Sequence, residues 1–160
     1  MNPRAEKMFV HTTAVPGTKI KAGVGVIVCD VHGRILLEKR SDCGLWGMLG
    51  GAIDPGESVE STAIREVQEE SGFEIKVGGL VGVYSEVATH MLVYPSNGDV
   101  RQLIDIVLEA RIIGGTLRIS HESEDLAFFS VDHLPPEDEI VPPARAPLAD
   151  FFAGRRGVLK

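Results

Sequence analysis

The sequence predicts a single domain of the α/β (α+β) class, in which a mixed sheet packs against helices. Apolar, β-branched segments typical of strands recur along the 160 residues, with glycine- or proline-containing turns between them. Residues 58–71 have instead the spacing of an amphipathic helix. A chain of this length can bury roughly 70% of the surface that its unfolded form exposes. We therefore expect residues 1–160 to form one domain.

The strands expected before the helix begin with a hairpin. Residues 1–19 are expected to form an N-terminal arm or a first edge strand. The run Lys21–Cys29 predicts a buried strand, which the turn Asp30–Gly33 joins to a partner strand over Arg34–Arg40. A short strand over Leu45–Leu49 is expected to follow.

The helix and the elements after it complete the predicted fold. Ser58 is a suitable N-cap, Gly72 is a suitable helix end, and the expected apolar stripe is Val59, Ala63, Ile64 and Val67. The proline pair at 142–143 is expected to break the chain before residues 144–160, which form a helix over Ala144–Ala153 and a tail. Further strands are expected over Phe73–Tyr84, Met91–Val93, Leu103–Leu108 and Leu126–Phe129.

Composition argues against several classes of function. The net charge is −7, and the absence of a basic run argues against binding to a nucleic-acid polymer. No apolar stretch approaches the roughly 20 residues that span a bilayer, so no membrane partner is expected. No signal peptide is visible, and Cys29 and Cys43 are not spaced as a metal pair, so a reduced, cytoplasmic location is expected. Gly23 and Gly25 lie inside a strand pattern and not after it, which argues against a dinucleotide-binding loop.

Three carboxylates crowd one patch of the predicted helix. Glu66, Glu69 and Glu70 stand at i, i+3 and i+4, and such positions are neighbours on a helix surface. Like charges at this spacing destabilise a helix by roughly 0.2–0.5 kcal/mol per pair, so a bound cation would explain the cluster. Carboxylate oxygens are the ligands that Mg²⁺ and Mn²⁺ prefer. The alternative is a solvated acidic helix face, which is common in proteins.

The residues around the cluster favour the metal interpretation. Arg65 precedes Glu66 and lies one turn before Glu69, so it can pair with a carboxylate and orient it. Gly50 and Gly51 come shortly before the helix, where a backbone without side chains can approach a ligand closely.

The segment from Gly51 to Phe73 resembles the signature of the Nudix hydrolases. Every fixed position of that signature is filled at the required spacing, by Gly51, Glu57, Arg65, Glu66, Glu69, Glu70 and Gly72, with Phe73 at the last apolar position. The chain departs from the family upstream, where Leu49 replaces a common Pro and Asp54 replaces a common Glu. Both departures lie outside the carboxylate set and bear on substrate fit.

The resemblance implies a fold, a reaction and a cofactor. The implied fold is a mixed sheet sandwiched between helices. The implied reaction is hydrolysis of the pyrophosphate bond in a nucleoside diphosphate linked to another group X, by in-line attack of water on phosphorus. Mg²⁺ or Mn²⁺ would neutralise phosphate charge and lower the pKa of a bound water. The implied metal ligands are Glu66, Glu69, Glu70 and a carbonyl of Gly50 or Gly51.

Other acidic and basic residues are candidates for supporting roles. Arg65 is expected to orient a carboxylate. Glu57 lies about half a turn around the helix from Glu66, so a catalytic role and a capping role at the positive helix end both remain open. Family members often supply a general base from outside the signature, and Glu122 is the first candidate here, Glu124 the second and His121 the third. A solvated acidic loop is the alternative for all three.

Contacts with the substrate are harder to predict. Trp46 could stack on a nucleobase or pack in the core, and packing is the favoured interpretation. Arg40 and Arg101 could reach phosphates, or could be ordinary surface arginines. The segment Tyr94–Asp99 resembles a segment found in part of the family and is a candidate specificity loop, with Asp99 as its candidate substrate contact.

Two functions remain open after these observations, because Arg65, the glycine pair and the spacing argue against a third, a generic metal-binding or structural protein with an acidic helix. The first is a divalent-metal-dependent pyrophosphohydrolase that acts on a small nucleotide derivative. The second is a non-catalytic nucleotide sensor, although a sensor has no need of crowded, self-repelling carboxylates. ADP-ribose, oxidised nucleoside triphosphates, nucleotide sugars and dinucleoside polyphosphates all remain open as substrates. A homodimer is expected only because the family commonly forms one.

Overall fold

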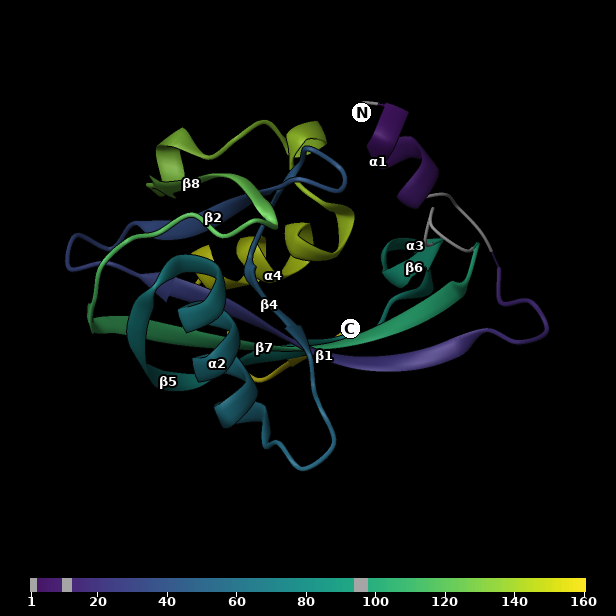
Figure 1. Ribbon diagram of the computed structural model, residues 1–160, viewed down its shortest axis with the longest axis horizontal. Coiled ribbons are helices and arrows are strands. Elements are labelled where there is room, and N and C mark those ends of the chain that lie inside the picture. The colour runs from purple at the N-terminus through teal and green to yellow at the C-terminus, as the bar shows by residue number, and fades with distance from the viewer. Residues whose placement is uncertain (1–2, 10–12, 94–97) are drawn as a thin grey trace.

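A computed structural model describes residues 3–9, 13–93 and 98–160, which form one mixed sheet with helices on both faces (Figure 1). The strand order is β3-β2-β1-β7-β5-β9, while β4 pairs with β1, β6 with β7 and β8 with β2. The helices are α1 (Pro3–Met8), α2 (Val59–Ser71), α3 (Val87–His90) and α4 (Pro142–Phe152). The strands are β1 (Lys19–Cys29), β2 (Ile35–Arg40), β3 (Trp46–Gly47), β4 (Leu49–Ala52), β5 (Phe73–Tyr84), β6 (Met91–Val93), β7 (Val100–Gly115), β8 (Ser123–Phe129) and β9 (Val158–Leu159).

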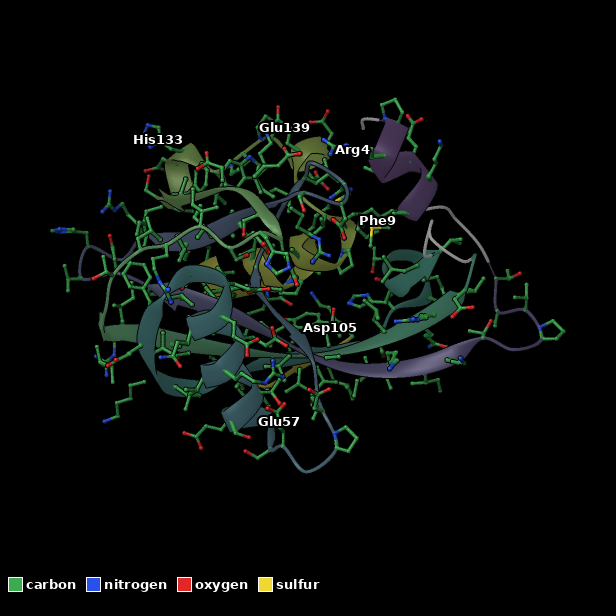
Figure 2. All side chains as sticks on the ribbon, viewed as in Figure 1. Arg4, Phe9, Glu57, Asp105, His133 and Glu139 are labelled. Atoms are coloured by element: carbon green, nitrogen blue, oxygen red, sulfur yellow. The ribbon has the colours of Figure 1, made fainter. Side chains whose placement is uncertain are left out.

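Two layers of apolar side chains hold the helices against the sheet (Figure 2 draws the side chains). Successive side chains of a strand point to opposite faces, and the centre of β1 shows this alternation. Val26 and Val28 belong to a buried cluster with Ala63 and Val67 of α2, whereas Ile27 belongs to the cluster that contains α1 and α4 residues. The predicted arrangement, a mixed sheet between helices, is therefore confirmed.

Helix α2 begins and ends where the sequence predicts. The Ser58 side chain accepts a hydrogen bond from the Ser61 N–H, and the Ser61 side chain accepts one from the Ser58 N–H, which completes a capping box. Gly72 ends the helix with φ 74°. The expected apolar stripe is wrong at Ile64, which is 40% exposed. The buried face runs instead through Ala63, Val67 and Glu70. One of the three carboxylates thus continues the core-facing side of the helix.

The two chain ends differ from the prediction. Residues 3–8 form helix α1, not an arm or a strand, because Ala5 and Met8 are buried against the core. Pro142 and Pro143 begin α4 and do not break the chain, since proline is tolerated in the first turn of a helix. The tail ends in β9, which runs parallel to β5. No helix in the described ranges is long and apolar enough to cross a membrane.

A buried carboxylate fixes the C-terminal tail. Asp150 on α4 is fully buried and accepts a hydrogen bond from the Tyr84 hydroxyl at 3.0 Å. It also pairs with Arg155 at 2.7 Å and with the Lys160 ammonium at 2.9 Å. These cations hold the pKa of Asp150 below its usual value. The tail is thereby tied to β5 by contacts between residues far apart in the sequence.

Candidate active site

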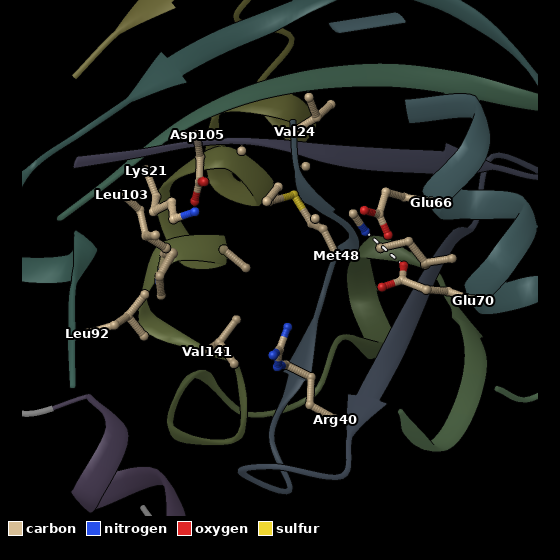
Figure 3. A pocket seen from close by; sticks show the side chains of 18 of the residues that line it. Lys21, Val24, Arg40, Met48, Glu66, Glu70, Leu92, Leu103, Asp105 and Val141 are labelled. Atoms are coloured by element: carbon tan, nitrogen blue, oxygen red, sulfur yellow. Dashed lines mark hydrogen bonds between the residues drawn. The ribbon is translucent and has the colours of Figure 1, made fainter. Parts of the chain in front are cut away.

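A pocket of about 440 Å³ opens above the centre of the sheet. Strand β4 pairs antiparallel with β1 and places Gly50 and Gly51 beside Gly25 and Val24. Glu66 and Glu70 of α2 lie at one end of the pocket, and Lys21, Leu103 and Asp105 lie at the other, with Met48 between them (Figure 3). All three glutamates of the predicted cluster line this pocket, as do both glycines.

Glu70 is a buried carboxylate at the α2 end of this pocket. It is 6% exposed, and its Oε2 accepts a hydrogen bond from the Gly50 N–H at 2.9 Å (Figure 3). Loss of solvation, reinforced by the negative charges of Glu38 and Glu66, raises the pKa of Glu70 to about 9. Burial also raises the pKa of Glu66. The fold thus brings acidic groups together at a site where their ionised forms are costly.

Neither glycine of the pair beside these carboxylates leaves space for a side chain. A Cβ on Gly51 would overlap the Glu66 carboxylate and lie 2.6 Å from its carbon. Gly50 has φ 139°, and a Cβ there would strike the Val24 carbonyl. Both positions therefore require glycine, one for space and one for backbone conformation.

Arg65 ties several carboxylates together beside the pocket. Its guanidinium forms a bidentate pair with Glu57, at 2.6 and 2.8 Å, and donates to Glu66 at 2.8 Å and to Glu69 at 3.3 Å. These hydrogen bonds lower the pKa of Glu57 to about 2. Glu57 also accepts a hydrogen bond from the Thr62 hydroxyl at 2.9 Å and does not line the pocket. In this structure Glu57 anchors Arg65, and the capping box of Ser58 and Ser61 caps the helix.

The donor set at this end of the pocket suits a hard divalent cation. Carboxylate and backbone carbonyl oxygens are the preferred ligands of Mg²⁺, and a cation would offset the repulsion between the buried carboxylates. Glu69 is 61% exposed on its side chain and turns toward Arg65. Within the described part of the chain, no three acidic, histidine or cysteine side chains already converge as a metal site. Glu66 and Glu69 would therefore have to rotate toward an ion.

The three predicted general-base candidates have different surroundings in the structure. Glu122 lines the pocket, and its charge contributes to the raised pKa of Glu66. Glu124 pairs instead with Arg4 of α1 at 3.0 Å. The His121 side chain is 91% exposed, although its Nε2 lies 3.7 Å from Glu122. Glu122 is therefore the best placed of the three.

Only some of the predicted substrate contacts line the pocket. Arg40 lines the pocket, where Asp42 holds its guanidinium through hydrogen bonds of 2.6 and 3.0 Å. Arg101 lines it too and lies 3.9 Å from Asp99. Trp46 is buried, packs edge-to-face on Phe129 at 5.0 Å and does not line the pocket. It therefore packs in the core, which was the favoured of its two predicted roles. Residues 94–97 of the predicted specificity loop lie outside the described residues.

A model of the NUDIX domain matches residues 19–151. The chain belongs to the NUDIX family. This NUDIX chain is 34% identical to an ADP-ribose pyrophosphatase of Methanocaldococcus jannaschii, over 68% of the chain and 61% of that protein. It is 31% identical to a MutT-like protein of Streptomyces ambofaciens, over 69% of the chain and 63% of that protein.

Solved structures agree with the fold of this NUDIX chain. A MutT NUDIX hydrolase from Burkholderia pseudomallei superposes with a TM-score of 0.67 at 28% identity, over 82% of the chain and 98% of that structure. A UDP-X diphosphatase superposes with a TM-score of 0.68 at 23% identity, over 92% of the chain and 68% of that structure. The chain spans 42–63% of the length of the first curated relatives that it matches.

Sequence reasoning missed three polar residues near the pocket of the NUDIX chain. Asp105 and Lys21 line it, and His90 is buried behind Asp105 with its Nε2 3.7 Å from Oδ2. A signal for Asp105 was present, because it is a single acidic residue in the apolar strand segment LIDIVL. Gly23 and Gly25 gave a second signal, since glycine inside a strand often marks close approach of another group.

Proposed function

We propose that this NUDIX chain hydrolyses the pyrophosphate bond of a nucleoside diphosphate linked to another group X, with Mg²⁺ or Mn²⁺ held by Glu66, Glu69 and Glu70. The observation that carries the proposal is the buried Glu70 beside Glu66 in a pocket where Gly51 leaves space for the Glu66 carboxylate and the Gly50 N–H binds Glu70. Such a cluster is costly for a protein that binds no cation. The relatives named as a pyrophosphatase and a hydrolase support the reaction class.

Different residues of the chain have different roles in the proposed hydrolysis. A divalent ion, when bound, neutralises phosphate oxygens and lowers the pKa of water. Arg65 donates hydrogen bonds to Glu66 and Glu69 and would orient them as they turn toward the ion. Glu122 lies in the pocket as a base that can accept a proton from the attacking water. Arg40 supplies a positive charge in the same pocket for a phosphate of the substrate.

A turnover screen tests this proposal. Phosphate release is measured for ADP-ribose, nucleoside triphosphates, nucleotide sugars and dinucleoside polyphosphates, with Mg²⁺ or Mn²⁺ and a coupling phosphatase. We expect metal-dependent turnover of at least one class, and a loss of about 100-fold or more in Glu70→Gln. Glu60→Gln is the matched control, because Glu60 is exposed on the same helix and should leave turnover unchanged. Nucleotide binding without turnover of any member would contradict hydrolysis and support a sensor.

A further inference from the structure

The end of the pocket opposite the glutamates is a second polar site. Asp105 of β7 lines the pocket with a side chain that is 17% exposed. Figure 3 shows it across the pocket from Glu66 and Glu70, at the end where Leu92, Leu103 and Val141 also lie. Asp105 and the neighbouring Lys21 thus stand beside apolar side chains, apart from the carboxylates proposed to bind metal.

The sheet is built to admit this carboxylate. Strands β1 and β7 run parallel with Gly23 opposite Asp105, and a Cβ on Gly23 would lie 3.0 Å from Oδ1. Two residues further along, a Cβ on Gly25 would lie 2.9 Å from the Met48 methyl group. The two strand glycines therefore leave room for Asp105 and Met48, and any side chain at Gly23 would crowd the carboxylate.

The hydrogen-bonding capacity at this end is unfilled. His90 is 1% exposed, and its Nδ1 lies 3.2 Å from the Glu86 carbonyl and 2.8 Å from the Thr89 hydroxyl. Because a carbonyl only accepts, Nδ1 is assigned the proton in the neutral ring. The buried Nε2 faces Asp105 at 3.7 Å, beyond hydrogen-bond distance, and has no hydrogen-bond partner in the described part of the chain. Nε2 therefore donates no hydrogen bond to Asp105, and the carboxylate keeps its acceptor oxygens for a ligand in the pocket.

We propose that Asp105 determines substrate specificity by binding the N–H edge of a guanine base. The inference deepens the proposed function, because it rests on the same pocket and names the nucleotide that the pocket takes. Loss of solvation raises the pKa of Asp105 to about 6, so the group is mostly an acceptor-only carboxylate at neutral pH. Guanine presents two adjacent donors, N1–H and N2–H, to such a carboxylate. Adenine presents one donor beside an acceptor lone pair, which the carboxylate repels.

The walls of this end suit a nucleobase better than a sugar. Leu92, Leu103, Met48 and Val141 offer apolar surface to the flat faces of a base, whereas a sugar would turn several hydroxyl groups toward it. The distribution of polar groups also orients the nucleotide. Glu66, Glu70 and Arg40 lie where its phosphates and their metal would be, and Asp105 lies at the far end, where its base would be (Figure 3).

A binding experiment tests the inference independently of turnover. The dissociation constants of GDP, IDP and ADP are measured by calorimetry with Mg²⁺ present, for the wild type, Asp105→Asn and the control Glu60→Gln. Inosine lacks only the N2 amine of guanine, so the series removes one donor and then exchanges the other for an acceptor. We expect the wild type to bind GDP about 10-fold or more tightly than ADP, with IDP between them. In Asp105→Asn, which presents one donor and one acceptor, the ratio of GDP to ADP affinity should fall by about 10-fold or more.

The outcomes separate this inference from the proposed function. Equal wild-type affinities for the three nucleotides would overturn the inference without any variant. Equal weakening of all three in Asp105→Asn, with the melting temperature unchanged, would also overturn it. Hydrolysis of the matched triphosphates is measured in parallel. Base preference without turnover would contradict the proposed function and leave the role of Asp105 supported.

Discussion

Replacing Glu70 by glutamine should change how the stability of the metal-free protein depends on pH. The folded state keeps Glu70 protonated up to about pH 9, whereas an unfolded chain releases that proton near 4.5, the ordinary value. Between these values the folded state binds one more proton than the unfolded state. The free energy of unfolding of the wild type therefore falls as pH rises through this range. Glutamine never ionises and can still accept the Gly50 N–H, so this contribution disappears in Glu70→Gln.

The magnitude follows from the width of that range. Each pH unit over which the two states differ by one proton changes the free energy of unfolding by about 1.4 kcal/mol. Between pH 4.5 and about pH 7.5, Glu70 alone should lower wild-type stability by on the order of 4 kcal/mol relative to Glu70→Gln. Glu38 and Glu66 have pKa values raised by burial as well. They are present in both proteins, so the difference between wild type and variant isolates Glu70.

Urea unfolding measures this difference directly. The free energy of unfolding is determined in EDTA from about pH 5 to about pH 9 for wild type, Glu70→Gln and Glu60→Gln. The Glu70→Gln curve should be flatter than the other two, and added Mg²⁺ should stabilise the wild type and Glu60→Gln but not Glu70→Gln. Equal slopes for the wild type and Glu70→Gln would refute the assignment of a strongly raised pKa to Glu70.

Three further predictions concern residues that support the site or the fold. Arg65→Lys should lower kcat by about 10-fold or more at saturating metal. A lysine cannot keep both the bidentate pair with Glu57 and the contact with Glu66. An unchanged kcat would contradict the orienting role of Arg65. Gly51→Ala should weaken Mn²⁺ binding, measured by electron paramagnetic resonance, because its Cβ would overlap the Glu66 carboxylate; equal affinity would show that Glu66 moves away at no cost. Asp150→Ala should lower the free energy of unfolding by about 1–3 kcal/mol, because it leaves the buried Tyr84 hydroxyl without its hydrogen-bond partner. The melting temperature and the urea midpoint measure this loss, and a change within experimental error would contradict it.

Local signals predicted the elements that local chemistry determines. Helix α2 was predicted because Ser58 can cap it and Gly72 can end it in the left-handed conformation, and both act through neighbouring backbone. The carboxylates of α2 share one pocket because their spacing puts them on adjacent helix positions. The central strands were predicted for a similar reason, since β-branched runs suit a buried sheet. The ends of these strands were not predicted, as β7 shows by extending well beyond Leu103–Leu108.

What the sequence left hidden depends on contacts between distant residues. Strand β9 exists because Asp150 and β5 hold the tail, and α1 packs where its Ala5 and Met8 find the core. The role of Glu57 also needed the structure, because its partner Arg65 faces it across the first turns of α2. The Asp105 end of the pocket depends on the parallel register of β1 and β7, which no local pattern encodes.

The central claim is that the carboxylates of α2 support metal-dependent attack of water on a pyrophosphate. The most direct test is hydrolysis of the best substrate from the screen in H₂¹⁸O with Mg²⁺, followed by mass spectrometry of the products. We predict one ¹⁸O atom in only one of the two phosphate products, no cleavage in EDTA, and a loss of about 100-fold or more in labelled product with Glu70→Gln. Cleavage that persists in EDTA, or labelled product formed by Glu70→Gln at the wild-type rate, would contradict the account.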